Sequence, residues 1–369
     1  MIYVYMENAI FMQKGKTMAK KKVAVLFGGV SADHNASLKT AYSVLNGIPK
    51  DIYEPMPIGI TRAGRWLFYP GAYENILDGS WETDSDCCSC ILSPDALHKG
   101  VVKILPDGSS SISRVDAIFP VLHGKYGEDG RIQGLCRMTG LPVIGNDMSS
   151  ANITQDRKLT NIVLKDAGFD VADYMTLSRD EIDDIESAME KVMKSFSFPL
   201  YVAATSCSSS IGAYRAENKE QLCEAIKTAF SHHPVIIIEN ELKGRIIECA
   251  IITRERAEDY IELGELVPDA DTDSSEFVAA TYDFVIPAAL DSDMAQKVKE
   301  VAKSAFKVLS CRCYARIDLL LCEDKIYVRR VRGVPGLEDN NIFTRLMTNS
   351  SFEYSEMLDY LISSAIDKR

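Results

Sequence analysis

The chain has 369 residues, of which 46% are hydrophobic and 25% charged, and its formal net charge is −12 at pH 7. This length exceeds what one compact core usually supports, so we expect two or three domains of a globular protein. The acidic excess argues against nucleic acid or an anionic membrane as the main partner, although it leaves room for a local basic pocket. No segment is apolar enough to predict a transmembrane helix.

The first 21 residues do not resemble part of a domain. An apolar stretch, Met1–Met12, precedes a group of lysines, which is the reverse of the order in a secretory signal peptide. We interpret the segment as a flexible leader or an over-extended start, with Met18 as a candidate first residue. Without a secretory signal, the ten cysteines are expected to be reduced thiols and the protein cytoplasmic.

The first predicted domain begins with a strand, a glycine turn and a helix. An apolar run at Lys22–Phe27 ends in Gly28-Gly29, and a helical pattern follows from about Ala36 to Leu45. Further runs of strand length lie at Tyr53–Ile60, Ala117–Leu122 and Leu141–Ile144. We interpret residues 61–115 as an insertion, with a hairpin around Ala63-Gly64 and then a polar, cysteine-rich loop. This succession predicts an open α/β sheet.

Two further units follow along the chain. A helical pattern at Ser150–Ala167 opens the second, a small α+β domain with strands predicted at Phe198–Ala203 and Val235–Ile238. The third is predicted to contain a strand, a long helix, two facing strands and a closing helix, at Cys249–Thr253, Met294–Leu309, Tyr314–Leu321, Ile326–Arg332 and Ser355–Ile366. The predicted domains are therefore residues 22–146, 147–239 and 240–369, after a leader at 1–21.

Two glycine-containing loops follow predicted strands of the first domain. Gly28-Gly29 leads into a helix whose free amides attract anions, although simple turn chemistry explains the glycines equally well. The second loop, between His123 and Gly130, places a histidine, Glu128 and a further acid at the carboxyl end of a strand. Open α/β sheets bind ligands at that edge. A lone histidine is more often structural, but so dense a polar cluster favours a binding site.

A serine-rich segment, Thr205–Gly212, lies between two predicted strands of the second domain. Small hydroxyl residues before a glycine can fold over phosphates through their backbone amides. A solvated hairpin has the same composition, and by itself the segment favours that simpler interpretation.

Charged residues alternate on the two facing strands near the C-terminus. Arg316 and Asp318 share one face of their strand, as do Arg330 and Arg332 on the next. One pairing register places Asp318 opposite Arg330, and a shift by one residue places Arg329 there instead. In either register an aspartate faces an arginine, for which an ordinary cross-strand ion pair is a sufficient explanation.

Taken together, these four segments occur in the order and approximate spacing found in D-alanine–D-alanine ligases, which the chain resembles from residue 22 to about 366. Within that family, Pro57–Trp66 is most similar to the vancomycin-resistance branch that makes D-alanyl-D-serine. The resemblance implies an ATP-grasp fold with an N-terminal Rossmann-like domain. It also implies ATP- and magnesium-dependent joining of D-amino acids through an acyl phosphate, in peptidoglycan precursor synthesis, by a protein that is commonly dimeric.

Matching positions imply roles for individual residues. The implied catalytic residues are Arg316, His123 and Ser209. The implied substrate contacts are Gly28, Gly29, Asn35, His123, Glu128 and Asn341. The implied ATP or phosphate contacts are Arg157, Ser209, Ser210, Glu239, Arg330 and Arg332. Asp318 matches one metal ligand.

Several positions depart from the family pattern. Ala203, Ile246 and Asn35 replace a phosphate-binding lysine, a ribose-binding glutamate and a substrate-binding glutamate, and an aromatic loop is shortened around residues 275–282. Arg330 and Arg332 replace the metal-binding pair of glutamate and asparagine.

The two arginines add three positive charges at the metal position. An arginine about 4 Å from a divalent ion is repelled by several kcal/mol even at an effective dielectric constant near 20. Its guanidinium has no lone pair for a metal, although it can hold phosphate directly. The sequence therefore predicts that magnesium binding is lost.

Two functional hypotheses follow from the sequence. The chain is either an active D-alanine–D-alanine or D-alanine–D-serine ligase with an altered phosphate site, or a pseudoenzyme that acts by binding. In the second case it pairs with itself or with an active ligase, or senses D-alanine or a D-alanyl precursor. The charge change at the metal position favours the pseudoenzyme.

Overall fold

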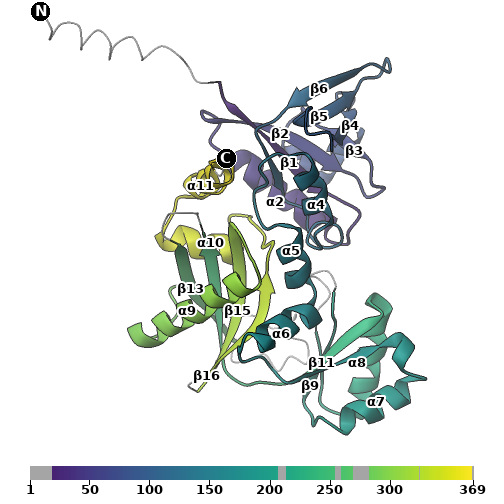
Figure 1. Ribbon diagram of the computed structural model, residues 1–369, viewed down its shortest axis with the longest axis vertical. Helices are drawn as coiled ribbons and strands as arrows, with labels where there is room; N and C mark the ends of the chain where they lie inside the picture. The colour runs from purple at the N-terminus through teal and green to yellow at the C-terminus, as the bar shows by residue number, and fades with distance from the viewer. Residues whose placement is uncertain (1–18, 207–212, 254–258, 269–281, 324, 368–369) are drawn as a thin grey trace, which may run out of the picture.

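The computed structural model describes residues 19–206, 213–253, 259–268, 282–323 and 325–367 (Figure 1). Residues 1–18 of the predicted leader, both Ser209 and Ser210, and most of the shortened loop at 275–282 lie outside these ranges. Three sheets organise the described chain, and helices α5 and α6 lie between the upper sheet and the lower right sheet in Figure 1.

The N-terminal sheet has seven strands in the order β6-β5-β4-β3-β2-β1-β7. Its strands are β1 Lys21–Gly28, β2 Tyr53–Ile60, β3 Trp66–Phe68, β4 Cys88–Leu92, β5 Gly100–Ile104, β6 Ser110–Arg114 and β7 Ala117–Pro120. The strand β1 is parallel to both β2 and β7, whereas β3 to β6 pair antiparallel. The predicted α/β opening is confirmed.

Two predictions for this sheet were wrong in detail. The segment expected to be a cysteine-rich loop forms β4, because Cys90 and Leu92 alternate with more exposed residues and pack into the core as small apolar side chains. The strand expected at Leu141–Ile144 is only an isolated bridge between Ile118 and Val143. Pro142 lies in this segment and has no N–H to donate to a longer ladder.

Helices from both ends of the chain cover the N-terminal sheet. The N-terminal ones are α2 His34–Gly47, α3 Glu74–Asp78, the 3-10 turn η1 Ser80–Thr83 and α4 Arg131–Met138. The last helix, α11 Tyr354–Ile366, contributes Leu358, Leu361 and Ile362 to the same core. Tyr53 of β2 donates a hydrogen bond to Asp359 at 2.7 Å. The C-terminal helix is therefore packed on the first sheet.

A four-stranded antiparallel sheet in the order β10-β9-β11-β8 forms the middle of the chain. Its elements are β8 Tyr174–Ser178, η2 Arg179–Glu181, α7 Ile185–Met193, β9 Leu200–Ala204, β10 Tyr214–Ala216, α8 Lys219–His232 and β11 Val235–Asn240. The preceding helix was predicted to be continuous, but it is divided into α5 Met148–Gln155 and α6 Arg157–Asp166. Asp156 causes the break, because its carboxylate caps α6 by accepting from the backbone N–H of Lys158 at 2.8 Å.

The C-terminal sheet has the order β14-β13-β12-β15-β16. Its elements are β12 Arg245–Ile252, β13 Tyr260–Pro268, β14 Tyr282–Val285, α9 Ser292–Val308, β15 Tyr314–Cys322, β16 Lys325–Arg332 and α10 Ile342–Ser350. In the β15–β16 ladder, Asp318 pairs with Arg330 and Arg316 with Arg332. The first of the two registers left open by the sequence is confirmed.

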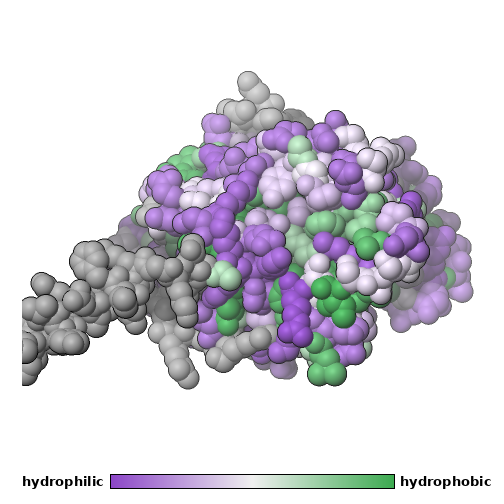
Figure 2. Space-filling model, turned by 90° about the horizontal axis from the view of Figure 1, so that it is seen from above, coloured by the Kyte–Doolittle hydropathy of each residue, from purple (hydrophilic) through white to green (hydrophobic). Residues whose placement is uncertain are grey.

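The surface seen from above is mostly hydrophilic, with scattered apolar patches (Figure 2). Among the helices in the described ranges, none is long and apolar enough to span a membrane. The nine cysteines in these ranges are free thiols.

Candidate ligand-binding site

A cavity of about 290 Å³ lies where the N-terminal and C-terminal sheets meet. Its walls come from α2, the loop after β7, α5, β15, β16 and the segment that follows β16. The cavity brings together six residues predicted from the sequence, which are His123, Glu128, Arg316, Arg330, Arg332 and Asn341. Polar groups at the carboxyl end of β7 thus face the charged strands of the distant C-terminal sheet, as expected for a ligand site.

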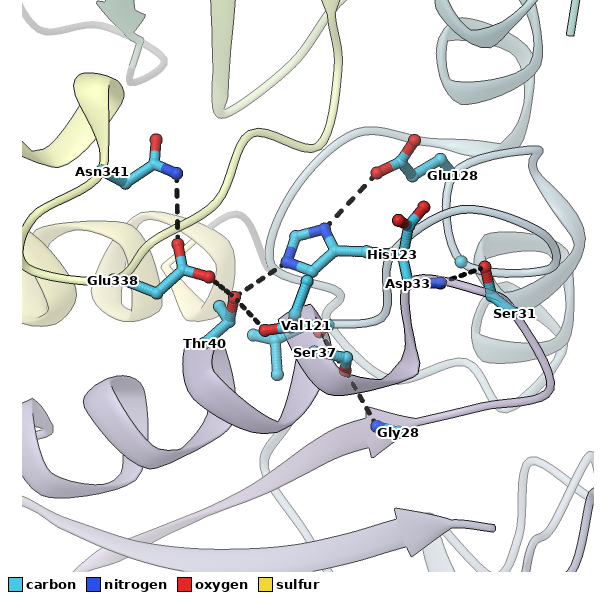
Figure 3. Close-up of polar contacts among 12 residues, drawn as sticks. Gly28, Ser31, Asp33, Ser37, Thr40, Val121, His123, Glu128, Glu338 and Asn341 are labelled. Carbon is cyan, nitrogen blue, oxygen red and sulfur yellow. Dashed lines mark hydrogen bonds and ion pairs between the residues drawn. The ribbon is translucent and has the colours of Figure 1, made fainter. Parts of the chain in front are cut away.

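One end of the cavity holds a hydrogen-bonded chain centred on His123 (Figure 3). The ring Nε2 lies 2.8 Å from the hydroxyl of Thr40, and Nδ1 lies 3.4 Å from Glu128. Thr40 donates to Glu338 at 2.6 Å, and Asn341 donates to the other oxygen of Glu338 at 3.2 Å. Because Thr40 uses its proton on Glu338, it accepts from His123, so both ring nitrogens act as donors.

This arrangement favours a charged imidazolium. Burial lowers the pKa of His123, but its hydrogen bond to Glu128 and the charges of Glu128, Glu338 and Asp33 outweigh burial and hold this pKa above its ordinary value. Burial raises the pKa of Glu128, yet the hydrogen bond and charge of His123 hold it below its ordinary value. Each partner therefore favours the ionised form of the other, inside a site where both side chains are almost covered.

Replacing Glu128 by glutamine is expected to make stability depend less on pH near neutrality. His123 has a raised folded pKa, so its contribution is fully present below the unfolded pKa and is lost as the pH rises through the folded pKa. The stability difference between the natural chain and Glu128→Gln should be larger at pH 6 than at pH 9. It should amount to about 1.4 kcal/mol for each pH unit by which Glu128 raises the pKa of His123.

Urea denaturation at pH 6 and pH 9 measures this difference. Glu54→Gln is the matched control, because Glu54 forms an exposed ion pair with Lys22. An equal loss of stability at both pH values in Glu128→Gln would contradict the assignment of an ionised pair.

The other end of the cavity holds three arginines from neighbouring strands. Arg316 of β15 lies 3.0 Å from Glu248 of β12 and 3.2 Å from Asp318. Arg332 of β16 lies 3.6 Å from the second oxygen of Asp318. Strand alternation places these residues on one face, because Glu248 pairs with Asp318 and Asp318 pairs with Arg330 across the sheet.

The acids of this cluster hold their protons unequally. Burial raises the pKa of Glu248 to about 8, whereas the charges of Arg316 and Arg332 outweigh burial and hold the pKa of Asp318 well below its ordinary value. The proton that the two carboxyls share therefore resides on Glu248 at neutral pH. The charge of Arg332, followed by burial, lowers the pKa of Arg330 to about 9, so Arg330 stays charged beside a like charge.

A second cleft, of about 510 Å³, lies between the middle and C-terminal sheets. Arg157 of α6 forms an ion pair with Glu239 of β11, which also accepts from Asn161 at 3.3 Å. Ile246 lines the same cleft. Ala203 lies nearby in β9 and is almost fully buried. The structure thus brings the predicted nucleotide contacts Arg157 and Glu239 together, and the two side chains form an ion pair with each other.

Comparison with known proteins places this geometry in a family. The model of the D-Ala–D-Ala ligase N-terminus matches residues 22–146, and that of the D-Ala–D-Ala ligase C-terminus matches residues 163–363. The chain belongs to the D-alanine–D-alanine ligase family. A ligase of this name from Caldicellulosiruptor bescii is 34% identical over 357 residues, which cover 95% of this chain and 96% of the relative.

Solved structures of ligases show the same architecture. The VanG D-Ala:D-Ser ligase of Enterococcus faecalis is 30% identical, with a TM-score of 0.83 over 94% of this chain and 99% of that chain. The D-alanine–D-alanine ligase of Coxiella burnetii is 25% identical, with a TM-score of 0.81 over 95% of both chains. The predicted ATP-grasp fold with a separate N-terminal α/β sheet is confirmed.

Three of the substrate contacts implied by the ligase family lie outside the lining of the cavity. Gly28 has a φ of +85°, and a Cβ there would lie 2.3 Å from the carbonyl oxygen of Ile60, so the turn requires glycine. Gly29 is the next residue in this turn, with a φ of +98°. Asn35 is exposed and accepts a hydrogen bond from Arg62 at 2.9 Å. Their part in substrate binding stays a prediction.

Three residues of the ligase site were missed from the sequence. Glu248 is the one charged side chain in the apolar strand segment Ile246–Ile252, a signal that could have identified it. Thr40 and Glu338 come from segments almost 300 positions apart and carry no local motif. Only the tertiary fold reveals that they join His123 to Asn341.

Proposed function

We propose that this protein keeps the substrate-binding scaffold of a D-alanine–D-alanine ligase without its magnesium-dependent phosphoryl transfer. One observation carries the proposal: Arg330 and Arg332 lie on β16 in register with Asp318 and Arg316. By resemblance, positions 330 and 332 hold metal ligands in active ligases. The protein would then act by binding D-alanine or a D-alanyl precursor.

The donor set at this position does not fit a magnesium ion. Magnesium prefers octahedral oxygen ligands, commonly carboxylates and water. Asp318 is already paired with Arg316 and Arg332, and Glu248 keeps a proton at neutral pH because burial raises its pKa to about 8. Within the described part of the chain, no group of three or more histidine, cysteine or acidic side chains is placed to hold a metal ion.

The opposite end of the cavity supports retained binding of a small polar ligand. The imidazolium of His123 is held by Glu128 and Thr40, and Glu338 is fixed by Thr40 and Asn341. Fixed donors and acceptors of both signs suit an amino acid or dipeptide, which carries an ammonium and a carboxylate. The relatives named above are ligases of D-alanine, which supports this ligand class.

The competing function is an active ligase with an arginine-substituted phosphate site. Its support is the 34% identity over 95% of the chain, together with the preserved positions of Arg316 and His123 in one cavity. In this hypothesis the arginines would take over the neutralisation of phosphate charge that magnesium provides in other phosphoryl-transfer enzymes.

Phosphate release from ATP in the presence of D-alanine and magnesium separates the two functions. The Caldicellulosiruptor bescii ligase, assayed in parallel, provides the reference. We expect a rate at least about 1,000-fold lower for this chain, because the electrostatic stabilisation of the transferring group is lost. A rate within about tenfold of the reference would overturn the proposal in favour of the active ligase.

A further inference from the structure

The arginine end of the cavity carries more positive than negative charge. Arg316, Arg330 and Arg332 supply three guanidinium groups, whereas the acids paired with them are Asp318 and Glu248. Even with both acids ionised, the guanidinium groups of this cluster outnumber its carboxylates by one. Two further carboxylates line the cavity: Glu128, whose charge also acts on Arg330 and Arg332, forms an ion pair with His123, and Glu338 accepts from Thr40 and Asn341. Buried charges are ordinarily paired, so the local excess of arginine favours a further anion at this end of the cavity.

Unused hydrogen-bond donors of Arg330 and Arg332 also favour a bound anion. Arg330 donates no hydrogen bond and forms no ion pair with any residue in the described ranges, although it lines the cavity. The Nε of Arg332 is buried and makes no hydrogen bond with any described residue. Each guanidinium has five N–H donors in a planar fork. The guanidinium groups of Arg330 and Arg332 therefore both carry N–H donors that no described residue accepts.

We propose that this end of the cavity binds the phosphoryl group of a ligand directly, without a divalent cation. The inference rests on the proposed function, because it requires that the metal position has become an arginine site. Two guanidinium forks from one strand match the oxygens of a tetrahedral dianion and supply its neutralising charge. The ligand class is thus a small phosphorylated compound, for which inorganic phosphate is the minimal probe.

A metal-independent site differs from a metal-bridged site in its response to magnesium. In a bridged site the cation joins protein carboxylates to phosphate oxygens and strengthens binding. Here the guanidiniums repel the cation, and magnesium can only compete with them for phosphate in solution. Magnesium should therefore leave phosphate affinity unchanged or weaken it.

Thermal denaturation of the full chain with inorganic phosphate tests the proposal. Phosphate in EDTA should raise the melting temperature, whereas acetate at equal ionic strength should raise it much less. Addition of magnesium should not increase the shift. An equal shift with acetate, or a shift that requires magnesium, would overturn the proposal.

The variant Arg330→Gln distinguishes a binding residue from a structural one. Without phosphate it should melt at a higher temperature than the natural chain, since it removes a like charge beside Arg332. Its affinity for phosphate, measured by calorimetry, should fall at least about tenfold, since a charge-assisted fork is lost. Lys325→Gln, which removes an exposed charge from the same strand, should not change phosphate affinity.

Each result bears on the proposal separately from the proposed function. A lower melting temperature or unchanged phosphate affinity in Arg330→Gln would overturn the anion site. Magnesium-dependent turnover would instead overturn the proposed function. Absence of phosphate binding together with absence of turnover would refute the anion site alone.

Discussion

Replacing Arg316 by leucine is expected to lower the free energy of unfolding by about 3–5 kcal/mol. Arg316 is 8% exposed and is the nearest cation to both Glu248 and Asp318. Leucine fills much of the volume, but Glu248 loses the guanidinium that lies 3.0 Å from it, and Asp318 keeps the longer contact with Arg332 at 3.6 Å. Urea denaturation at pH 7 measures the loss.

Arg312→Leu is the control for this substitution. Arg312 lies 3.3 Å from Asp147, but its side chain is 54% exposed, so solvent screens the pair. Loss of this ion pair should lower the free energy of unfolding by less than about 1 kcal/mol. Equal losses in the free energy of unfolding for the two variants would show that burial does not strengthen the ion pairs of Arg316.

Restoring the family pattern on β16 is expected to create magnesium dependence. In the double variant Arg330→Glu, Arg332→Asn, the repulsive guanidiniums are exchanged for oxygen donors beside Asp318. Calorimetric titration should show that magnesium strengthens ATP binding at least about tenfold in this variant, because the ion can then bridge protein and phosphate oxygens.

A charge-neutral variant provides the matched control for the restored pair. Arg330→Gln with Arg332→Gln removes the same repulsion without supplying a carboxylate, so its response to magnesium should be smaller. Adding Ala203→Lys to the restored pair should rescue ligase activity only in part, because Ile246, Asn35 and the shortened loop around residues 275–282 remain. Full activity would show that those three departures are unimportant.

The sequence predicted the hairpin of β15 and β16 well, because strand alternation is local. The spacing of Arg316 and Asp318 placed both on one face, and a turn near residue 324 limited the register to two choices. One of these, with Asp318 opposite Arg330, is the register observed. The charged face of the site therefore followed from pattern alone.

Other features depended on packing between distant segments. Asp156 caps α6 and thereby separates it from α5. The apolar pattern continues across this position, so it predicted one helix. Glu248 became part of the site only because β12 pairs with β15. Glu338 reaches Thr40 across 298 positions of sequence, a contact that no local periodicity encodes.

Calorimetric titration of the natural chain with ATP, with and without magnesium, measures directly whether the metal site is lost. We expect that magnesium does not strengthen ATP binding, because Arg330 and Arg332 repel the ion and Asp318 is already paired. ATP binding that strengthens about tenfold or more with magnesium would contradict this expectation, and would show that the arginines leave a metal site intact.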